Sequence, residues 1–305
     1  MKGKIALLDY FDGKEAAALL IDGELHDFFA EPGANAPGSI FKVKVKHQIK
    51  GSGGIFVESP DGDFFLHKTQ GITSGDVILV QVSSYGDREK LPRVTTKLLF
   101  KSRYVIVTPF NEGLNIAKNI QDNERRIQLK QLVVEGLDHI PYGMILRSSC
   151  ASANKSEIIS DCKNTITAAQ NVLSAEDKQM GLIHRAPSPH QLAWREWIDM
   201  PALDKTSGTF AEHGVLELID ELKHSKVILN NGNYYIEPTK AFVAIDVNTA
   251  GDISFAAGLK ANLAMAKDLP RQLRLRGLGG QIVVDPAPML RQDRKIVENA
   301  LKSSL

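Results

Sequence analysis

The sequence predicts a protein of several subdomains that combines α+β and α/β parts. Its 305 residues, 43% of them hydrophobic, exceed what one core usually holds and indicate two or more compact units. A strand–helix–strand pattern over residues 241–285 predicts parallel strands joined by a crossover helix. Short strands separated by glycine-rich turns over about 41–99 predict a small β-barrel.

The chain opens with two short apolar strands, at 4–9 and 16–21, which are joined through Asp12-Gly13. This pattern predicts a hairpin or meander. Two strands of this length do not form a stable domain alone. We therefore expect them to pack against a segment from later in the chain.

The predicted barrel has features of proteins that bind single-stranded nucleic acid, for which the OB-fold is a common design. The alternating run Phe41–Lys46 places three lysines on one face, and Phe56, Phe64 and Phe65 are candidates for stacking on bases. The alternative is structural. Lysines on a strand often only protect an edge from pairing, and about half of such phenylalanines would belong to the core.

Helices alternate with short strands in the middle of the chain. Residues 103–108 and 144–148 have the pattern of strands, and Asp122 and Asn154 can cap two helices. The second helix would carry Cys162 on its buried stripe. No P-loop, nucleophile elbow or HExxH motif is present in the sequence, which argues against NTPase, α/β-hydrolase and zinc-protease functions.

Two apolar runs near the C-terminus end in aspartates. Residues 241–245 run directly into Asp246, and residues 280–284 run into Asp285. Because the helix between them, over about 255–276, makes the strands parallel, both carboxylates would emerge at the same sheet edge. Paired carboxylates with an adjacent amide suit Mg²⁺, which keeps several waters and binds phosphates.

The sequence therefore predicts a metal-assisted phosphodiester site. Asn248 lies two residues after Asp246, hence on the same face, where its amide could orient a water or a phosphate. Arg271, Arg274 and Arg276 end the crossover helix, where a polyanion would need them. Alternatively, a strand-end aspartate is often a cap or turn residue, and arginines at a helix end often only complement its dipole. The conjunction of these features favours the metal site.

The motifs around these residues resemble the catalytic signature of the ribonuclease E/G family of bacterial endoribonucleases. They are Asp246–Thr249, Arg271–Gly280 and Ile282–Asp285. The resemblance implies that Asp246 and Asp285 bind Mg²⁺ and that Asn248 positions the attack. It also implies endonucleolytic hydrolysis of single-stranded RNA in RNA processing or decay, leaving 5′-phosphate and 3′-hydroxyl ends.

The resemblance implies further contacts with RNA. In the barrel, Phe56, Phe65 and Lys90 fall where the family pattern places its RNA-channel residues, so the adjacent Phe64 would face the core. Arg271 and Arg274 in the signature are further candidates for RNA binding.

A sensor for the 5′-phosphate of RNA is also implied. Arg147 and Ser148 would form it above the backbone around Ser102 and Ile106. The chain departs from the family pattern here, because Ser102 replaces the usual glycine and Lys118-Asn119 replaces a pair of arginines. These departures put 5′-end sensing in question.

The resemblance also implies the order of the subdomains. Residues 1–35 and 188–232 would form an RNase H-like subdomain. Residues 36–99 would form the OB-fold barrel, and residues 100–187 a 5′-phosphate-sensor-like subdomain. Residues 233–305 would form a DNase I-like catalytic subdomain.

The expected partner is single-stranded RNA, and a net charge of +1 does not oppose this because the local placement of cations matters. No apolar run reaches membrane-spanning length, and Cys150 and Cys162 lack metal-ligand spacing, so we expect a cytoplasmic protein with reduced thiols and no membrane partner. The chain ends soon after Asp285, before the cysteine pair that shares zinc between subunits in longer family members. We therefore expect no zinc-linked tetramer, and the homodimer is left as an open alternative. The alternative function is a non-catalytic RNA-binding relative.

Overall fold

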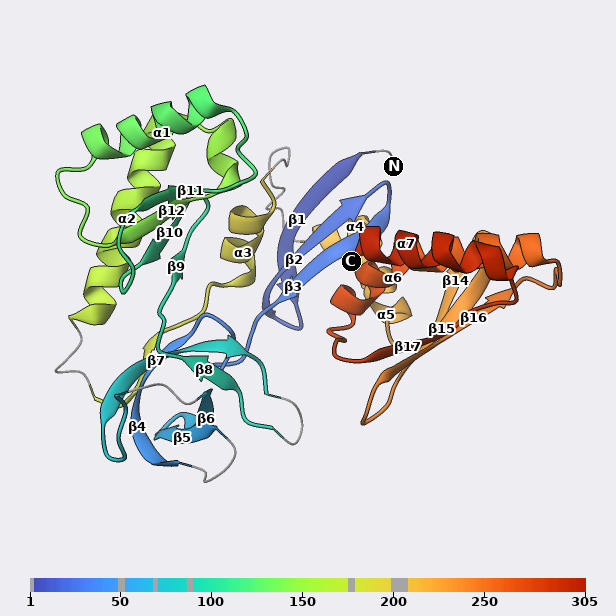
Figure 1. Ribbon diagram of the computed structural model, residues 1–305, viewed down its shortest axis with the longest axis horizontal. Coiled ribbons are helices and arrows are strands. Elements are labelled where there is room, and N and C mark those ends of the chain that lie inside the picture. Colours follow the sequence, from blue (N-terminus) through green and yellow to red (C-terminus); the bar gives the residue numbers. More distant parts are fainter. Residues whose placement is uncertain (1–2, 49–52, 68–70, 87–89, 175–178, 199–207) are drawn as a thin grey trace. The chain divides into compact units, whose positions relative to one another are not determined.

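The computed structural model describes residues 3–48, 53–67, 71–86, 90–174, 179–198 and 208–305 (Figure 1). The chain divides into two compact units. One comprises Met1–Ala30 and Met200–Leu305, and the other comprises Glu31–Asp199. Within the described residues, no helix combines the length and the apolar character that crossing a membrane requires.

The first unit begins with an antiparallel sheet of three strands in sequence order: β1 (Lys4–Phe11), β2 (Lys14–Ile21) and β3 (Glu24–Ala30). Both connecting turns are Asp-Gly pairs in which the two residues have positive φ, 49° and 75° in the first turn. Such turns match the twist of the flanking strands, and Asp-Gly adopts them at little cost. The predicted meander is therefore confirmed.

A later segment covers this meander, as expected. The short helices α4 (Thr209–Glu212) and α5 (Val215–Glu221) insert Phe210 and Val215 into a core with apolar side chains of the meander. Asp9 fixes the junction, because its carboxylate accepts hydrogen bonds from the backbone N–H groups of Gly208 and Phe210. These bonds lower the pKa of Asp9 although burial alone would raise it.

The rest of the first unit is a sheet with the order β14-β15-β16-β17. Its elements are β14 (Lys226–Leu229), β15 (Gly232–Pro238), β16 (Val243–Thr249), α6 (Phe255–Leu275), β17 (Ile282–Asp285), the 3₁₀ turn η3 (Arg291–Asp293) and α7 (Arg294–Ser304). β16 and β17 are parallel, with α6 as their crossover, so the predicted strand–helix–strand unit is confirmed. The helices α6 and α7 lie on one side of this sheet (Figure 1).

The two faces of this sheet differ because side chains alternate along each strand. One face packs Tyr234, Ile245 and Val247 against Met265 and Leu269 of α6. The other face carries polar and exposed side chains. We call it the open face, and it is defined by Lys226, Ile228, Asn233, Tyr235, Glu237, Ala244, Asp246, Asn248, Val283 and Asp285.

In the second unit a closed barrel of five strands has the cyclic order β4-β5-β6-β8-β7, and β7 pairs back with β4. The strands are β4 (Ile40–Gln48), β5 (Gly54–Ser59), β6 (Gly62–His67), β7 (Val77–Ser84) and β8 (Arg93–Thr95), and β13 (Gly181–His184) adds to β4. Its core includes Phe41 and Phe64. The structure thus confirms an OB-like barrel.

The remainder of the second unit packs two helices on a small sheet with the order β11-β12-β10-β9. Its elements are β9 (Phe100–Lys101), β10 (Val105–Thr108), β11 (Leu114–Ile116), α1 (Asn123–Gly136), β12 (Gly143–Leu146), the 3₁₀ turn η1 (Ser148–Ala151), α2 (Lys155–Leu173) and α3 (Pro189–Glu196). Asp122 caps α1 as predicted. Cys162 is buried as predicted, and burial raises the pKa of its thiol to about 12.

The helix α3 lies within the compact unit formed by Glu31–Asp199. Its Trp194 packs edge-on against Tyr104, with ring centroids 6.4 Å apart. The RNase H-like and DNase I-like identities of the subdomains, and their boundaries, stay predictions.

Candidate active site

The two predicted carboxylates lie side by side. Asp246 on β16 and Asp285 on β17 are register partners in parallel strands, and both side chains are exposed. They share the open face because their neighbours Ile245 and Val284 point toward the core. The sequence argument placed the carboxylates at the strand tips. For Asp285 this is correct, whereas Asp246 lies inside its longer strand.

Asn248 joins the carboxylates on the same face. Its Nδ2 donates a hydrogen bond to Oδ2 of Asp246 over 2.8 Å. The bond holds the amide beside the carboxylate pair, in the place that the two-residue spacing predicts. Asn248 is only partly buried, so the amide is accessible to a ligand on the open face.

Contacts between α6 and the segment after β17 fix the position of Asp285. The buried side chain of Asn262 on α6 donates to the carbonyl oxygen of Ala287 and accepts from its N–H group, both over 2.9 Å. Nearby, a Cβ atom on Gly258 would lie 1.9 Å from the carbonyl oxygen of Pro288. Only glycine permits this close approach of the two backbones. The buried amide and the glycine together hold the end of β17 against the helix.

The donor set of the site fits Mg²⁺. Among the described residues, no group of three or more His, Cys, Asp or Glu side chains is arranged to hold a metal. The site therefore offers two carboxylates and one amide. Mg²⁺ commonly binds through one or two carboxylates and completes its shell with water and substrate phosphate oxygens.

The predicted arginines lie away from the carboxylates. As the crossover helix of parallel strands, α6 runs back along the sheet, which places Arg271 and Arg274 near the sheet end opposite to Asp285. Arg271 pairs with Asp268 over 2.7 Å and donates to the carbonyl oxygen of Leu25. The bond to Leu25 ties α6 to β3, so Arg271 has a structural role, although a different one from the helix-dipole alternative. RNA binding by Arg271 and Arg274 stays a prediction.

The barrel residues have the predicted orientation. Phe56 and Phe65 are register partners on β5 and β6, both are partly exposed, and their ring centroids are 6.2 Å apart. Phe64 is fully buried and packs against Phe41, which confirms that it faces the core. Lys90 is exposed beyond β7. The arrangement presents an aromatic pair on the barrel surface, as base stacking requires.

The predicted phosphate sensor is engaged in an internal ion pair. The guanidinium of Arg147 donates to Oε2 of Glu196 over 2.7 Å and to the carbonyl oxygen of Ser102 over 2.6 Å. Burial alone would raise the pKa of Glu196, but its hydrogen bond to Arg147 and the charge of Arg195 lower it. Ser148 is exposed at the start of η1. A phosphate at Arg147 must therefore compete with Glu196, a partner that sequence reasoning missed.

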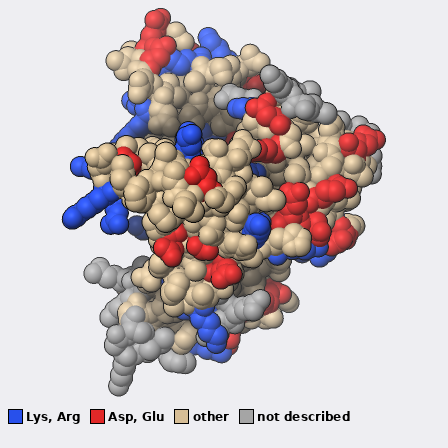
Figure 2. Space-filling model, turned by 90° about the vertical axis from the view of Figure 1, so that its right-hand side faces the viewer, with Lys and Arg blue, Asp and Glu red and all other residues tan. Residues whose placement is uncertain are grey.

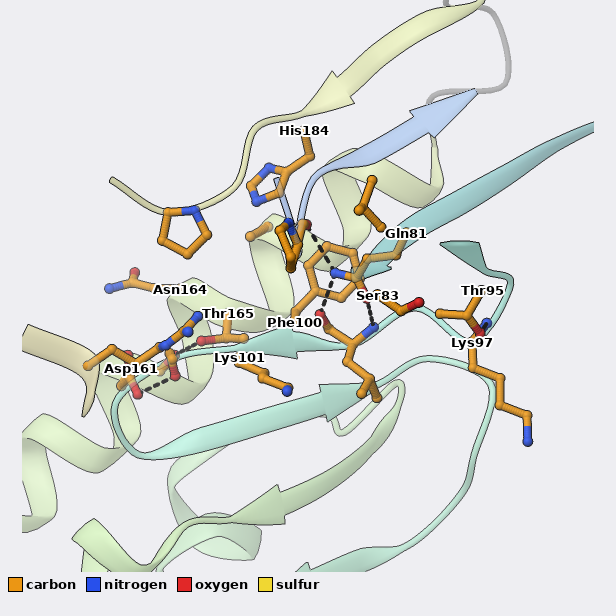
Figure 3. A pocket seen from close by; sticks show the side chains of 18 residues that line it. Gln81, Ser83, Thr95, Lys97, Phe100, Lys101, Asp161, Asn164, Thr165 and His184 are labelled. Carbon is orange, nitrogen blue, oxygen red and sulfur yellow. Dashed lines mark hydrogen bonds between the residues drawn. The ribbon is translucent and has the colours of Figure 1, made fainter. Parts of the chain in front are cut away.

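A cavity of about 500 Å³ lies in the same unit as the barrel, and its walls come from β7, β9, α2 and β13 (Figure 3). Polar side chains brace these walls. Gln81 bonds both the N–H and the carbonyl group of Leu99, and Asp161 accepts from the Ser102 hydroxyl over 2.5 Å. Lys101 also lines the cavity. Sequence patterns did not indicate this cavity because segments far apart in the sequence build it.

The surface charge is mixed. Figure 2 shows one face of the molecule, on which Lys and Arg side chains and Asp and Glu side chains lie in several separate groups. This agrees with the net charge of +1. Contacts with a polyanion would therefore depend on local groups of residues rather than on the overall charge.

Known proteins provide an independent comparison. The model of the ribonuclease E/G family matches residues 100–202 and 197–305. Ribonuclease G from Haemophilus influenzae is 27% identical over 252 residues, which cover 70% of this chain and 51% of that protein. Ribonuclease E from Synechocystis is 24% identical, over 89% of this chain and 49% of that protein. Ribonuclease G from Escherichia coli is 23% identical, over 88% of this chain and 68% of that protein.

The chain spans about half the length of the first two of these relatives. The family match nevertheless extends over most of the chain and includes Asp246, Asn248 and Asp285. The signature that the sequence suggested and the family comparison agree. The chain belongs to the ribonuclease E/G family.

Proposed function

We propose that this protein is a Mg²⁺-dependent endoribonuclease that cuts single-stranded RNA and that Asp246, Asn248 and Asp285 form its active site. The observation that carries the proposal is the register pairing of Asp246 with Asp285 on the open face. Two exposed carboxylates on adjacent strands have no packing role there. Their mutual repulsion favours a bound cation, and the relatives are named ribonucleases.

In the proposed mechanism Asp246 and Asp285 hold the metal ion. When bound, Mg²⁺ would supply Lewis-acid polarisation of a phosphoryl oxygen and a water of lowered pKa. Asn248 orients the water or the phosphate through its amide while its bond to Asp246 keeps the amide in place. Attack of water on phosphorus with departure of the 3′ oxygen leaves a 5′-phosphate and a 3′-hydroxyl end.

The barrel supplies RNA affinity in this proposal. Phe56 and Phe65 stack on bases, and Lys90 contacts the backbone. Because every base has an aromatic face, such contacts tolerate many sequences. The exposed pair fits a single strand better than a duplex, whose bases are already stacked.

The proposal is tested with a single-stranded oligoribonucleotide labelled at its 3′ end, so that the labelled product carries the newly formed 5′ end. We expect internal scission that needs Mg²⁺, stops with EDTA and yields 5′-phosphate products. Binding without scission at any Mg²⁺ concentration would instead identify a non-catalytic RNA-binding member of the family. Scission that persists in EDTA would contradict the metal-dependent mechanism.

A further inference from the structure

The open face carries a row of four side chains, one from each strand. Lys226 on β14 is the register partner of Tyr235 on β15, Tyr235 is the partner of Asp246, and Asp246 is the partner of Asp285. Register partners share a face, and adjacent strands lie about 4.8 Å apart. The row therefore leads from a cation, through an aromatic ring, to the two carboxylates.

Tyr235 differs sharply from its neighbour in the sequence. Tyr234 is fully buried, and its hydroxyl donates to Asp268 on α6. Tyr235 points the opposite way and is only partly buried. Its ring is not needed for the core of the sheet, so it is available to a ligand on the open face.

One face of the Tyr235 ring is directed toward the carboxylates. The Nζ atom of Lys226 lies over the ring, 6.0 Å from its centroid. Because β14 and β16 flank β15 on opposite sides, the ring face turned away from Lys226 is on the side of Asp246. Ile228, which is 81% exposed, adds apolar surface on the same face.

We propose that Tyr235 and Lys226 form a nucleotide subsite next to the scissile phosphate, in which a base stacks on Tyr235 and Lys226 contacts a neighbouring phosphate. The inference rests on the proposed function, because the occupant is the single-stranded RNA that is cut. Cation, ring and metal-binding carboxylates follow one another at intervals of one strand. This order matches the alternation of phosphate and base in a nucleic acid strand. Tyr235 and Lys226 are positioning residues and take no part in the reaction itself.

The first test compares substitutions by cleavage kinetics. Tyr235→Ala should lower kcat/KM about 5- to 150-fold, chiefly through KM, because it removes one base–aromatic stack. Tyr235→Phe keeps the ring and should retain most of the activity. Lys226→Ala should weaken binding and reduce the salt-dependence slope by about 1. The matched control is Tyr10→Ala, a substitution of another exposed tyrosine in the same unit. It should leave the kinetics unchanged.

The second test moves a single abasic nucleotide along the substrate. In the parent protein, an abasic nucleotide at one position next to the cut should lower the cleavage rate. In Tyr235→Ala, the same abasic nucleotide should cause no further decrease in the cleavage rate. An abasic penalty of equal size in parent and variant would overturn the inference. So would a change in oligomeric state, with unchanged RNA kinetics, in Tyr235→Ala, because a second copy would then cover the face.

Failure of the proposed function is distinguishable from failure of this inference. If the parent protein does not cut RNA, the abasic series is measured by equilibrium binding with fluorescence anisotropy. Loss of the abasic penalty in Tyr235→Ala supports the subsite in a binding protein. An unchanged penalty overturns it. Circular dichroism of each variant checks that the fold is retained.

Discussion

Asn248 donates a hydrogen bond to Asp246 from the same strand, with 2.8 Å between Nδ2 and Oδ2. The bond occupies one carboxylate oxygen and fixes the amide beside the position where two carboxylates meet. Under the proposed function, the amide would also reach a phosphate held there, and a side chain without a hydrogen-bond donor would not replace it.

Asn248→Ala should lower kcat about 100-fold or more while the protein stays folded. The expected loss follows from removing one preorganised hydrogen-bonding group at a reacting phosphate. The measurement is single-turnover cleavage of labelled RNA at saturating Mg²⁺. Asn233→Ala is the control, because Asn233 is the register partner of Asn248 on β15. An equal loss of kcat in both variants would show that any substitution on this face impairs cleavage. It would contradict a specific role for Asn248.

The Arg147–Glu196 pair predicts how 5′-end sensing can be altered. Glu196→Gln removes the negative charge that neutralises the guanidinium, which would then bind a phosphate with two parallel hydrogen bonds. The ratio of cleavage rates for 5′-monophosphate and 5′-hydroxyl RNA should therefore rise above that of the parent. The double variant with Arg147→Ala should lose this gain. A ratio that Glu196→Gln leaves unchanged would show that Arg147 takes no part in sensing.

The same pair predicts a pH dependence of stability. The folded-state pKa of Glu196 lies below its ordinary value of 4.5, so the pair stabilises the fold above that value. The contribution is lost as pH falls through the lowered pKa. The difference in free energy of unfolding between parent and Glu196→Gln should therefore shrink from pH 7 to pH 3 in urea titrations. The exposed Glu298 supplies the control, Glu298→Gln. A difference that stays constant over this range would contradict the assigned ion pair.

Two adjacent tyrosines provide a matched test of which face of the sheet is buried. Tyr234→Phe removes the hydroxyl that donates to Asp268 over 2.7 Å and should lower the free energy of unfolding by about 1–3 kcal/mol. Tyr235→Phe makes the same chemical change on the open face and should leave the free energy of unfolding unchanged. Urea denaturation measures both. A larger effect at Tyr235 would mean that the faces of the sheet have been assigned the wrong way round.

Local patterns predicted much of the fold. The Asp-Gly turns specify the meander, Asp122 specifies the start of α1, and the two apolar runs that end in Asp246 and Asp285 specify the crossover unit. In each case the information lies within a few neighbouring residues. For Phe64, the family resemblance placed Phe65 on the outer side of the strand, and alternation along the strand then assigned Phe64 to the core, where the structure finds it.

Tertiary partners were less predictable. Nothing adjacent to Arg147 in the sequence indicates Glu196 as its partner. The arginines at the end of α6 form a basic cluster in the sequence, and only the structure shows that Asp268 and the carbonyl oxygen of Leu25 bind Arg271. The parallel strands fix the direction of the crossover helix, so its arginines lie away from Asp285, contrary to the expectation from the sequence. Tyr235 was missed because only the register of β15 with β16 places it beside Asp246.

The carboxylate pair is tested most directly by Asp246→Asn and Asp285→Asn, measured for cleavage and for RNA binding in Mg²⁺. Both side chains are exposed, so each variant should stay within about 0.5 kcal/mol of the parent in stability. We expect each to lose internal scission of single-stranded RNA while still binding it. Scission at the parental rate in both variants would contradict the assignment of the site.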